Sequence, residues 1–411
     1  MMQETQQRVV VIGGGASGLM AAGTAAARGN AVTLLERNAL VGRKLAISGK
    51  CRCNLTNDTT VPALEKAIPG HAKFLRSAFY AFGPAETMAF FTRHGVPLKT
   101  ERGGRVFPVS DQAEEVVRAL WDYCLAHHVH LATGVSARRL CVAEGAVTGV
   151  EAEGGVVFPA EAVILATGGA SYPGTGSRGD GYRMAREVGH TIIPIRPSLV
   201  ALETVEHWPA EVQGVALRNV TLSAFAPDGK RVFSELGEML FTHFGVSGPL
   251  VLSASRHVAD QPGSRLEIDL KPGLDDTMLD ARLLRDFEQY SRREIINALD
   301  DLLPRSLIPV IVRLSGIPHA TPVHQITREQ RRALLILLKH VTLTVKKARG
   351  LAEAIITAGG VDTREIDSRS MASKLVRGLY VTGEVLDVDA YTGGYNLQIA
   401  WSTGYLAGKN V

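Results

Sequence analysis

The sequence has few features of disulfide-stabilised or membrane-spanning proteins. Only four of its 411 residues are cysteines, at positions 51, 53, 124 and 141, which is too few for a disulfide framework. No uninterrupted apolar run approaches the roughly 18 residues that span a bilayer. The first residues do not combine a basic flank with a long apolar stretch. We therefore expect a cytoplasmic protein without a signal peptide or a membrane partner.

The sequence also lacks a large excess of either positive or negative charge. Lys and Arg number 45 and Asp and Glu 41, and a net charge of +4 does not by itself imply a nucleic-acid partner. With 45% hydrophobic and 21% charged residues, the composition is that of a globular protein and excludes overall disorder. Glycine is abundant at 42 residues, and many of these lie in pairs at predicted strand ends, where a backbone can approach a ligand closely.

The first 36 residues have the pattern of a strand, a helix and a second strand. A β-branched strand over residues 8–12 precedes Gly13-x-Gly15-x-x-Gly18, an Ala-rich helix over 16–28 follows, and a strand over 31–35 ends at Glu36. In this context the three glycines predict a dinucleotide site, with a diphosphate at the helix N-terminus. Glu36 can accept hydrogen bonds from ribose hydroxyls, which favours an adenosine without a 2′-phosphate. The pattern does not separate FAD from NAD.

Two later strands are expected in the same parallel sheet although they lie far apart in the chain. Residues 162–166 run into Thr167-Gly168-Gly169, and residues 378–382 run into Gly383-Glu384. Between them, β-branched segments with turn residues predict a small barrel or sandwich. Helical patterns follow over about 274–339, including residues 293–303. We therefore predict an α/β fold with a Rossmann-like FAD-binding domain over 1–192 and 345–411. A β-barrel insert over 193–270 and a helical insert over 271–344 interrupt it.

A polar, Gly-containing loop follows the second strand. It includes Arg43 and Lys44, either of which could contact a phosphate, and then Ser48-Gly49 and Asn54. Such a loop can lie along a diphosphate and ribitol, and it favours FAD over NAD. Cys51 and Cys53 lie in it as well, but a lone C-x-C supplies at most two metal ligands, so no metal site is expected.

At these residues the chain resembles the BaiN/YhiN type of flavoprotein, also called BaiN/RdsA, a family of NAD(P)/FAD-dependent oxidoreductases. The resemblance covers about residues 8–408 and is closer to the BaiN-like branch. Four motifs carry it in the family's order: GRKLxxSGxxRCNxTN, ATGGASYPGTGS, FTHFGVSGP, and the run from Gly383 to Gly404. The family usually has glycine where this chain has Cys51, so the Cys51 side chain would perturb a backbone that needs a positive φ.

The resemblance implies FAD as cofactor and suggests cofactor roles for Glu36, Arg43, Ser48, Gly49, Asn54, Thr167, Gly168, Gly383, Glu384 and Asn396. We expect further cofactor contacts from Ala16, Ser17, Arg37, Val135 and Gly169. Gly394, Asn396 and Leu397 open the last predicted helix, whose N-terminus could stabilise negative charge on a reduced flavin. No second strand–GxGxxG–helix unit is present for a resident nicotinamide cofactor, so NADH or NADPH is expected only as a transient reductant.

Flavin chemistry of this kind requires a group that polarises a carbonyl or protonates a carbon. Three residues are candidates: Cys53 in the polar loop, His243 in a Gly-flanked turn of the barrel segment, and Tyr395 at the start of the last helix. Members of the resembled family are associated with conjugated ketones of the steroid or bile-acid class and with a uracil of ribosomal RNA.

The substrate class remains open between these two. Residues 328–349 carry seven basic residues and one acidic residue, which could contact RNA phosphates, but contain no aromatic residue for base stacking. We therefore place an NAD(P)H-driven ene-reductase of small molecules ahead of a ribosomal RNA dihydrouridine synthase. An amine or amino-ketone oxidase, and a redox sensor using Cys51 and Cys53 as a dithiol, are further alternatives.

Overall fold

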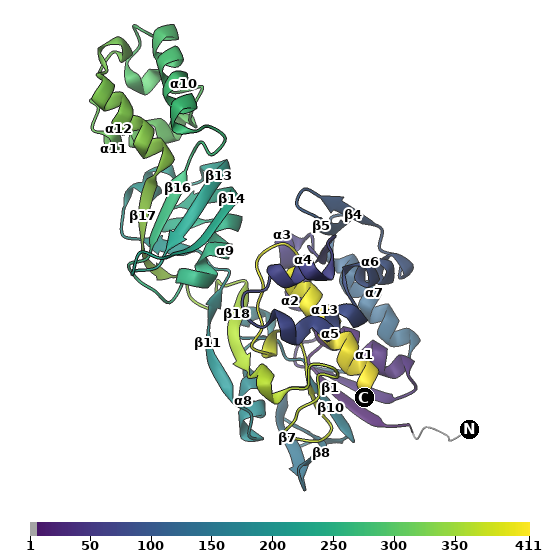
Figure 1. Cartoon of the computed structure of the whole chain (residues 1–411). Helices are drawn as coiled ribbons and strands as arrows, with labels where there is room; N and C mark the ends of the chain where they lie inside the picture. The colour runs from purple at the N-terminus through teal and green to yellow at the C-terminus, as the bar shows by residue number, and fades with distance from the viewer. Residues whose placement is uncertain (1–5) are drawn as a thin grey trace. The chain divides into compact units, whose positions relative to one another are not determined.

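The computed structural model describes residues 6–411 and divides them into two compact units (Figure 1). The sheet unit runs to Arg196 and resumes at Ile355–Val411, and the barrel unit is Pro197–Ala354. The first five residues, on which the expectation of no signal peptide partly depends, lie outside the described residues. Within residues 6–411, no helix combines the length and the apolar character needed to cross a membrane.

Five parallel strands form the centre of the sheet unit. Their order is β19 (Leu379–Val381), β10 (Ala162–Leu165), β1 (Arg8–Ile12), β2 (Ala31–Glu36) and β6 (His130–Thr133). The predicted strand–helix–strand unit is confirmed, and the two distant strands pair directly in one sheet. Valine and leucine side chains of β1, β2, β10 and β19 are buried on both faces, as a parallel sheet covered by helices requires, and the edge strand β6 is only partly buried.

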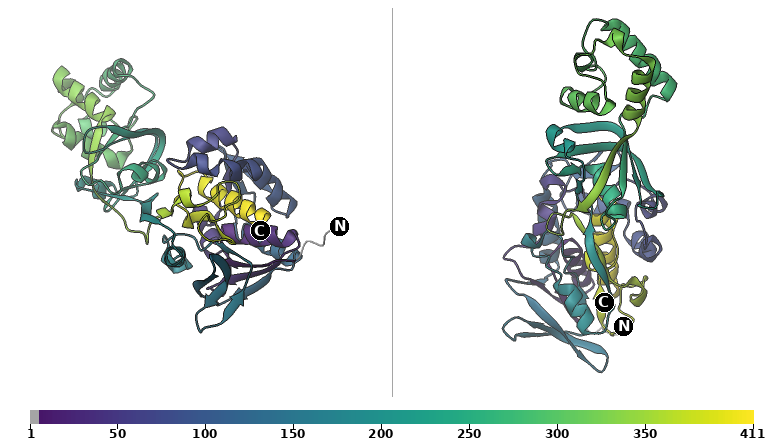
Figure 2. Two further views of the ribbon diagram at one scale, coloured as in Figure 1. Left: turned by 60° about the horizontal axis from the view of Figure 1, so that its bottom comes forward. Right: turned by 90° about the vertical axis from the view of Figure 1, so that its left-hand side faces the viewer.

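Helices from the two ends of the chain pack against each other in this unit. α1 (Ala16–Ala27) contacts α13 (Tyr395–Asn410), and both views of Figure 2 show the last helix beside the first segment. Glycine permits the close approach, because a Cβ added at Gly404 would lie 2.4 Å from the carbonyl oxygen of Ser17. The return segment is therefore an integral layer of the unit.

The remaining elements of the sheet unit surround this centre. Its helices are α2 (Arg43–Ala46), α3 (Ser48–Cys51), α4 (Val61–Lys66), α5 (Ala72–Ala81), α6 (Pro84–Arg93), α7 (Ala113–Ala126) and α8 (Asp180–Glu187). Three small sheets pair β3 (Thr56–Asn57), β5 (Arg105–Pro108) and β4 (Leu98–Glu101); β7 (Ala137–Ala143), β8 (Ala146–Ala152) and β9 (Val157–Pro159); and β11 (Ile192–Ser198) with β18 (Ile356–Val361).

The barrel unit contains a closed six-stranded barrel and four α-helices. The strand order is β12 (Leu202–Thr204), β15 (Gly245–Ser247), β14 (Arg231–Thr242), β13 (Ala216–Phe225), β16 (Arg265–Asp269) and β17 (Val341–Ala348). The helices are α9 (Pro249–Val258), α10 (Asp276–Gln289), α11 (Ile308–Ser315) and α12 (Arg328–Lys339). Within this unit, α10, α11 and α12 gather beyond one end of the barrel (Figure 1).

Two details differ from the sequence patterns. The strand β17, which closes the barrel, comes after the helices and crosses the predicted boundary at residue 344, and one continuous core joins barrel and helices. Residues 293–303 were predicted to be helical, but they contain only a short 3-10 turn at Ile295–Asn297. Glu294 instead forms a β-bridge with Pro322, and Ile295, Leu299, Leu302 and Leu303 lie in the core of the barrel unit although the segment is not an α-helix.

The α1–α13 contact generates a stability prediction. Gly404→Ala should lower the free energy of unfolding by about 1–3 kcal/mol, because the methyl group overlaps the Ser17 carbonyl. Helix propensity alone predicts the opposite sign, since alanine is favoured over glycine by about 1 kcal/mol. Urea unfolding followed by tryptophan fluorescence measures the change. Gly273→Ala, where an added Cβ meets nothing within 4 Å, is the control. A Gly404→Ala protein at least as stable as the parent would contradict the packing described.

Candidate functional site

A cavity opens where strands β1, β2 and β10 of the parallel sheet end. Every residue that lines it belongs to the sheet unit, including the return segment near Ile355, Glu384 and Asn396. Loops at the carboxyl ends of parallel strands are the usual ligand-binding edge of an open α/β sheet. The position of the cavity therefore follows from the topology.

Most of the predicted cofactor residues line this cavity. They are Gly13, Gly15, Ala16, Ser17, Glu36, Arg37, Arg43, Lys44, Ser48, Val135, Thr167, Gly168, Gly383, Glu384, Asn396 and Leu397. Five others do not line it: Gly18, Gly49, Asn54, Gly169 and Gly394. The contacts below show that several of these five shape the backbone around the cavity.

The three fingerprint glycines have different structural roles. A Cβ at Gly18 would lie 1.8 Å from the Gly13 carbonyl oxygen, and one at Gly13 would lie 2.5 Å from the Ala166 carbonyl oxygen. These two glycines therefore permit helix and sheet to pack closely. A Cβ at Gly15 would meet nothing within 4 Å, so Gly15 faces open space at the N-terminus of α1. This open cradle beside unsatisfied helix N–H groups fits the diphosphate of a dinucleotide such as FAD.

Glu36 is held in place at the end of β2. Its side chain is buried, one oxygen accepts from the Gly14 N–H at 2.8 Å, and the other accepts from the Asn38 N–H at 2.8 Å. The Asn38 side-chain amide adds a third hydrogen bond of 2.6 Å. These contacts fix the carboxylate at the edge of the cavity, next to the glycine turn.

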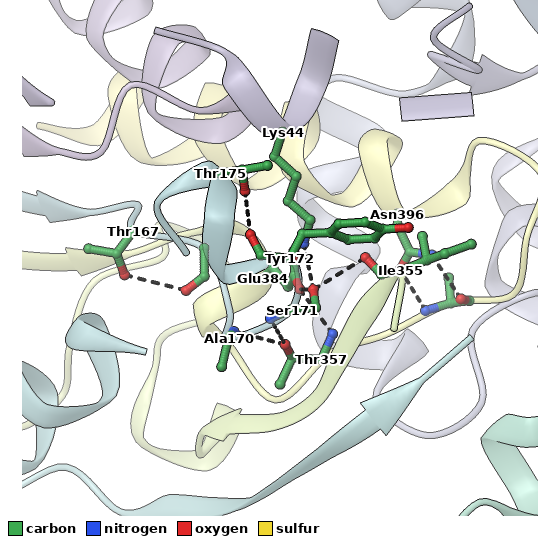
Figure 3. A network of polar contacts seen from close by, with 12 residues as sticks. Lys44, Thr167, Ala170, Ser171, Tyr172, Thr175, Ile355, Thr357, Glu384 and Asn396 are labelled. Atoms are coloured by element: carbon green, nitrogen blue, oxygen red, sulfur yellow. Dashed lines mark hydrogen bonds and ion pairs between the residues drawn. The ribbon is translucent and has the colours of Figure 1, made fainter. Parts of the chain in front are cut away.

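A polar network that includes the cavity-lining Lys44 and Glu384 joins four separate segments (Figure 3). Lys44 Nζ lies 2.6 Å from Glu384 Oε2 and 2.7 Å from Ser171 Oγ. Glu384 Oε1 accepts from Ser171 Oγ and from the Thr357 N–H, both at 2.9 Å. The Lys44 and Glu384 side chains are 26% and 14% exposed, so this ion pair is largely screened from solvent by protein.

Gly169 belongs to this network although it does not line the cavity. A Cβ there would lie 2.5 Å from Thr357 Oγ1 and 2.6 Å from Glu384 Oε1. The Thr357 hydroxyl also accepts from the Ala170 N–H at 2.9 Å. Sequence reasoning missed Ser171 and Thr357. Thr357 lies on a strand with no motif, and only the fold brings it to residues 169–171.

Arg37 and Arg43, two basic residues of the cavity wall, are already engaged with protein groups. Arg37 forms an ion pair of 2.6 Å with Asp180, and Arg43 donates to Asn38 Oδ1 at 2.8 Å. Asn38 also donates to the Thr175 carbonyl at 3.1 Å. These contacts tie the loop after β2 to the loop after β10, so the basic side chains are positioned before any ligand binds.

The start of α13 forms another rigid part of the cavity. The Asn396 amide nitrogen donates to the Ala390 carbonyl at 2.8 Å, and its oxygen accepts from the Ala390 N–H at 2.9 Å. Gly394 has a φ of 93°, and a Cβ there would lie 2.4 Å from the Thr56 carbonyl oxygen. With its amide oxygen facing Gly394, Asn54 accepts from that N–H at 3.0 Å. Asn54 and Gly394 therefore hold the turn that leads into Asn396.

The structure argues against Cys53 as a proton donor. Its side chain lies in the core of the sheet unit and does not line the cavity, and burial raises the pKa of the thiol to about 12. A thiol with so high a pKa is a weak acid and it lies outside the cavity lining, so Cys53 is no longer a candidate. Burial also weakens the hypothesis of a redox-active Cys51–Cys53 dithiol, because only Cys51 is exposed. Cys51 has a φ of 65°, the conformation that favours the family's usual glycine.

The other two candidate acids also lie outside the cavity lining. Tyr395 is the first residue of α13, directly before Asn396, and its side chain is partly buried. His243 belongs to the barrel unit, in the turn between β14 and β15, where its ring contacts Phe244. Tyr395 and His243 therefore remain hypotheses for the proton donor. Within residues 6–411, no group of three His, Cys, Asp or Glu side chains is arranged to hold a metal ion.

Internal ion pairs neutralise much of the basic segment over residues 328–349. Arg331 pairs with Asp280 at 2.8 Å, and Lys339 with Asp269 at 2.6 Å. Arg349 pairs with Glu203 and Glu353. The positive charge left for an RNA is therefore smaller than the sequence predicts.

The Lys44–Glu384 pair generates a second prediction. Lys44→Met should destabilise the protein by about 1–3 kcal/mol, since it leaves Glu384 shielded from water without its cation. Adding Glu384→Gln should recover part of this loss, because the glutamine oxygen can still accept from Thr357 and Ser171. Thermal unfolding of the parent, the Lys44→Met and Glu384→Gln single variants and the double variant gives the coupling energy between the two residues. Arg8→Met, which breaks the exposed Arg8–Glu161 pair, should cost at most about 1 kcal/mol. Additive effects of Lys44→Met and Glu384→Gln would contradict the coupling.

Comparison with known proteins identifies relatives over almost the whole chain. The chain is 36% identical over 411 residues to a 3-dehydro-bile acid delta(4,6)-reductase of Clostridium scindens, covering 98% of each chain. It is 32% identical over 406 residues to a ribosomal RNA dihydrouridine synthase of Escherichia coli K12, covering 98% of this chain and 97% of the relative.

Solved structures and a family model agree with the fold. A 3-ketosteroid-delta4-(5alpha)-dehydrogenase from Rhodococcus jostii RHA1 superposes with a TM-score of 0.51 at 16% identity, covering 100% of this chain and 98% of the other. At that identity the likeness concerns the fold alone. The family model described as the HI0933-like protein Rossmann domain matches residues 7–410. The resemblance to the BaiN/YhiN type is thus confirmed, and the chain belongs to the HI0933-like family.

Proposed function

We propose that this protein is an FAD-dependent oxidoreductase that uses NADH or NADPH to reduce a carbon–carbon double bond conjugated to a carbonyl in a steroid-like or bile-acid-like small molecule. The observation that carries the proposal is the cavity of the sheet unit. It combines an open glycine cradle at a helix N-terminus, a fixed carboxylate at the end of β2, and polar loops from both halves of the chain. This combination suits a long dinucleotide better than a compact ligand.

The residues of the cavity divide between two ends of such a cofactor. Gly15 and the N-terminus of α1 would hold the diphosphate, and Glu36 the adenosine ribose. Lys44, Ser48, Asn396 and Leu397 would surround the remaining part. Bound FAD supplies a two-electron carrier that can pass a hydride to an electron-poor carbon. The Lys44–Glu384 network fixes the loops against each other, which keeps the cavity in one shape and limits water around its polar groups.

The named relatives favour a small molecule over RNA as the acceptor. The bile-acid reductase has the higher identity of the two relatives named above, 36% against 32%, and its name gives a 3-dehydro-bile acid as the substrate. The internal ion pairs of residues 328–349 reduce the charge that an RNA backbone would need. A ribosomal RNA dihydrouridine synthase is the alternative function, and the choice of electron acceptor distinguishes the two.

The proposal predicts the behaviour of the purified yellow protein under anaerobic conditions. NADH or NADPH should bleach the flavin absorbance near 450 nm, and a conjugated ketone should restore it with formation of the saturated ketone. Stopped-flow absorbance measures both steps. Restoration by ribosomal RNA in place of the ketone would support the dihydrouridine synthase alternative. Bleaching by neither nucleotide would contradict the proposed reductase and favour an amine oxidase.

The proton donor can be identified by separating the two half-reactions. Replacing the acid that protonates the substrate carbon should slow reoxidation by about 10²–10⁴-fold while flavin reduction by NAD(P)H stays unchanged. We expect this pattern from His243→Asn or from Tyr395→Phe, and Cys53→Ala should leave both rates unaltered. The Cys53 variant also serves as a control for general disturbance of the loop. Unchanged reoxidation in both the His243 and Tyr395 variants would exclude them as donors.

A further inference from the structure

A second, shallow depression lies beside the cofactor cavity in the sheet unit. We call it the arginine depression, and it is lined by Arg178, Gly179, Tyr182, Arg183, Arg186, Ile192, Pro194 and Ile195. These residues come from the turn before α8, from α8 itself and from β11. Arg178 also lines the cofactor cavity, so the two sites share a wall.

The arginine depression is positively charged, and most of this charge is available to bind an anion. No acidic residue lines it. Arg183 is engaged, since it pairs with Glu187 at 2.8 Å and donates to the Arg138 carbonyl at 2.7 Å. Arg178 and Arg186 are exposed, and within residues 6–411 neither side chain forms an ion pair or a hydrogen bond. Two guanidinium groups can therefore bind an anion without first breaking a protein contact.

The depression also has apolar lining residues. They are Ile192, Pro194 and the 38% exposed Ile195, together with the buried Tyr182. The Tyr182 hydroxyl donates to the Glu384 carbonyl at 3.3 Å, and this residue belongs to the core of the sheet unit. Guanidinium groups and apolar side chains in one depression suit a ligand that combines phosphate with a planar, weakly polar group. An adenosine that carries a phosphate has this chemistry.

We infer that the arginine depression binds the adenosine 2′-phosphate end of NADPH and makes NADPH the preferred reductant. The inference depends on the proposed function, since it assumes that a pyridine nucleotide reduces the protein. Glu36 is fixed to Gly14 and Asn38 within the cofactor cavity, where it suits an adenosine without a 2′-phosphate. The two sites thus have opposite preferences at the 2′ position, which keeps the resident cofactor and the reductant apart.

Binding of a NADPH fragment tests the depression without reliance on catalysis. Isothermal titration of the FAD-loaded protein with 2′,5′-ADP should show binding, with 5′-AMP at least about tenfold weaker because it lacks the 2′-phosphate. Arg186→Ala should raise the dissociation constant for 2′,5′-ADP about tenfold. Arg118→Ala, which removes an exposed positive charge from α7 outside both sites, should leave it unchanged. No binding of 2′,5′-ADP, or equal binding by the parent and Arg186→Ala proteins, would overturn the inference.

Flavin reduction then separates this inference from the proposed function. Arg186→Ala should slow bleaching by subsaturating NADPH about tenfold and leave bleaching by NADH unaltered. If NADH and NADPH bleach the parent equally and the variant behaves like the parent, the depression is not the NADPH site although the reductase proposal stands. If neither nucleotide bleaches the flavin, the proposed function fails, and NADPH selectivity fails with it even if 2′,5′-ADP binds. Loss of RNA binding in Arg186→Ala, with 2′,5′-ADP binding intact, would assign the depression to RNA instead.

Discussion

The ion pair between Lys44 and Glu384 is the contact on which the cofactor cavity depends most. It joins the loop after β2 to the loop after β19, and Ser171 and Thr357 extend it to the loop after β10 and to β18. The barrel unit separates Lys44 and Ser171, in the first part of the sheet unit, from Thr357 and Glu384 in its return segment. The network converts two distant stretches of chain into one wall of a site.

Glycine makes this close assembly possible. At Gly18, Gly169 and Gly404 an added Cβ would overlap backbone or polar atoms of another segment, so each position requires a hydrogen in place of a side chain. Gly15 is the exception, because the space in front of it is open. Close packing between segments and space for a ligand are therefore two of the roles of glycine here, and backbone turns with a positive φ, as at Gly29 and Gly229, are a third.

Much of the fold could be predicted because its signals are local. The strand–glycine–helix–strand pattern, the strands over 162–166 and 378–382, and the helix that starts at Tyr395 depend on short-range spacing, and the structure contains each of them. Features set by tertiary contacts could not be predicted. Burial of Cys53, the partners of Arg37 and Lys44, and the closure of the barrel by β17 all depend on segments that meet only in the folded chain. Residues 293–303 have helical composition, yet core packing and the bridge to Pro322 determine their conformation.

The central claim is that the cavity beside Gly15 binds FAD, and one titration tests it most directly. Gly15 has a φ of −86°, which any residue adopts, and a Cβ added there meets no heavy atom within 4 Å. Protein freed of flavin should bind one FAD per chain when the cofactor is titrated back, measured by the change in flavin fluorescence. Gly15→Leu should fold with the same thermal stability in the FAD-free state and lose FAD binding. Equal FAD affinity in the parent and Gly15→Leu proteins would contradict the claim.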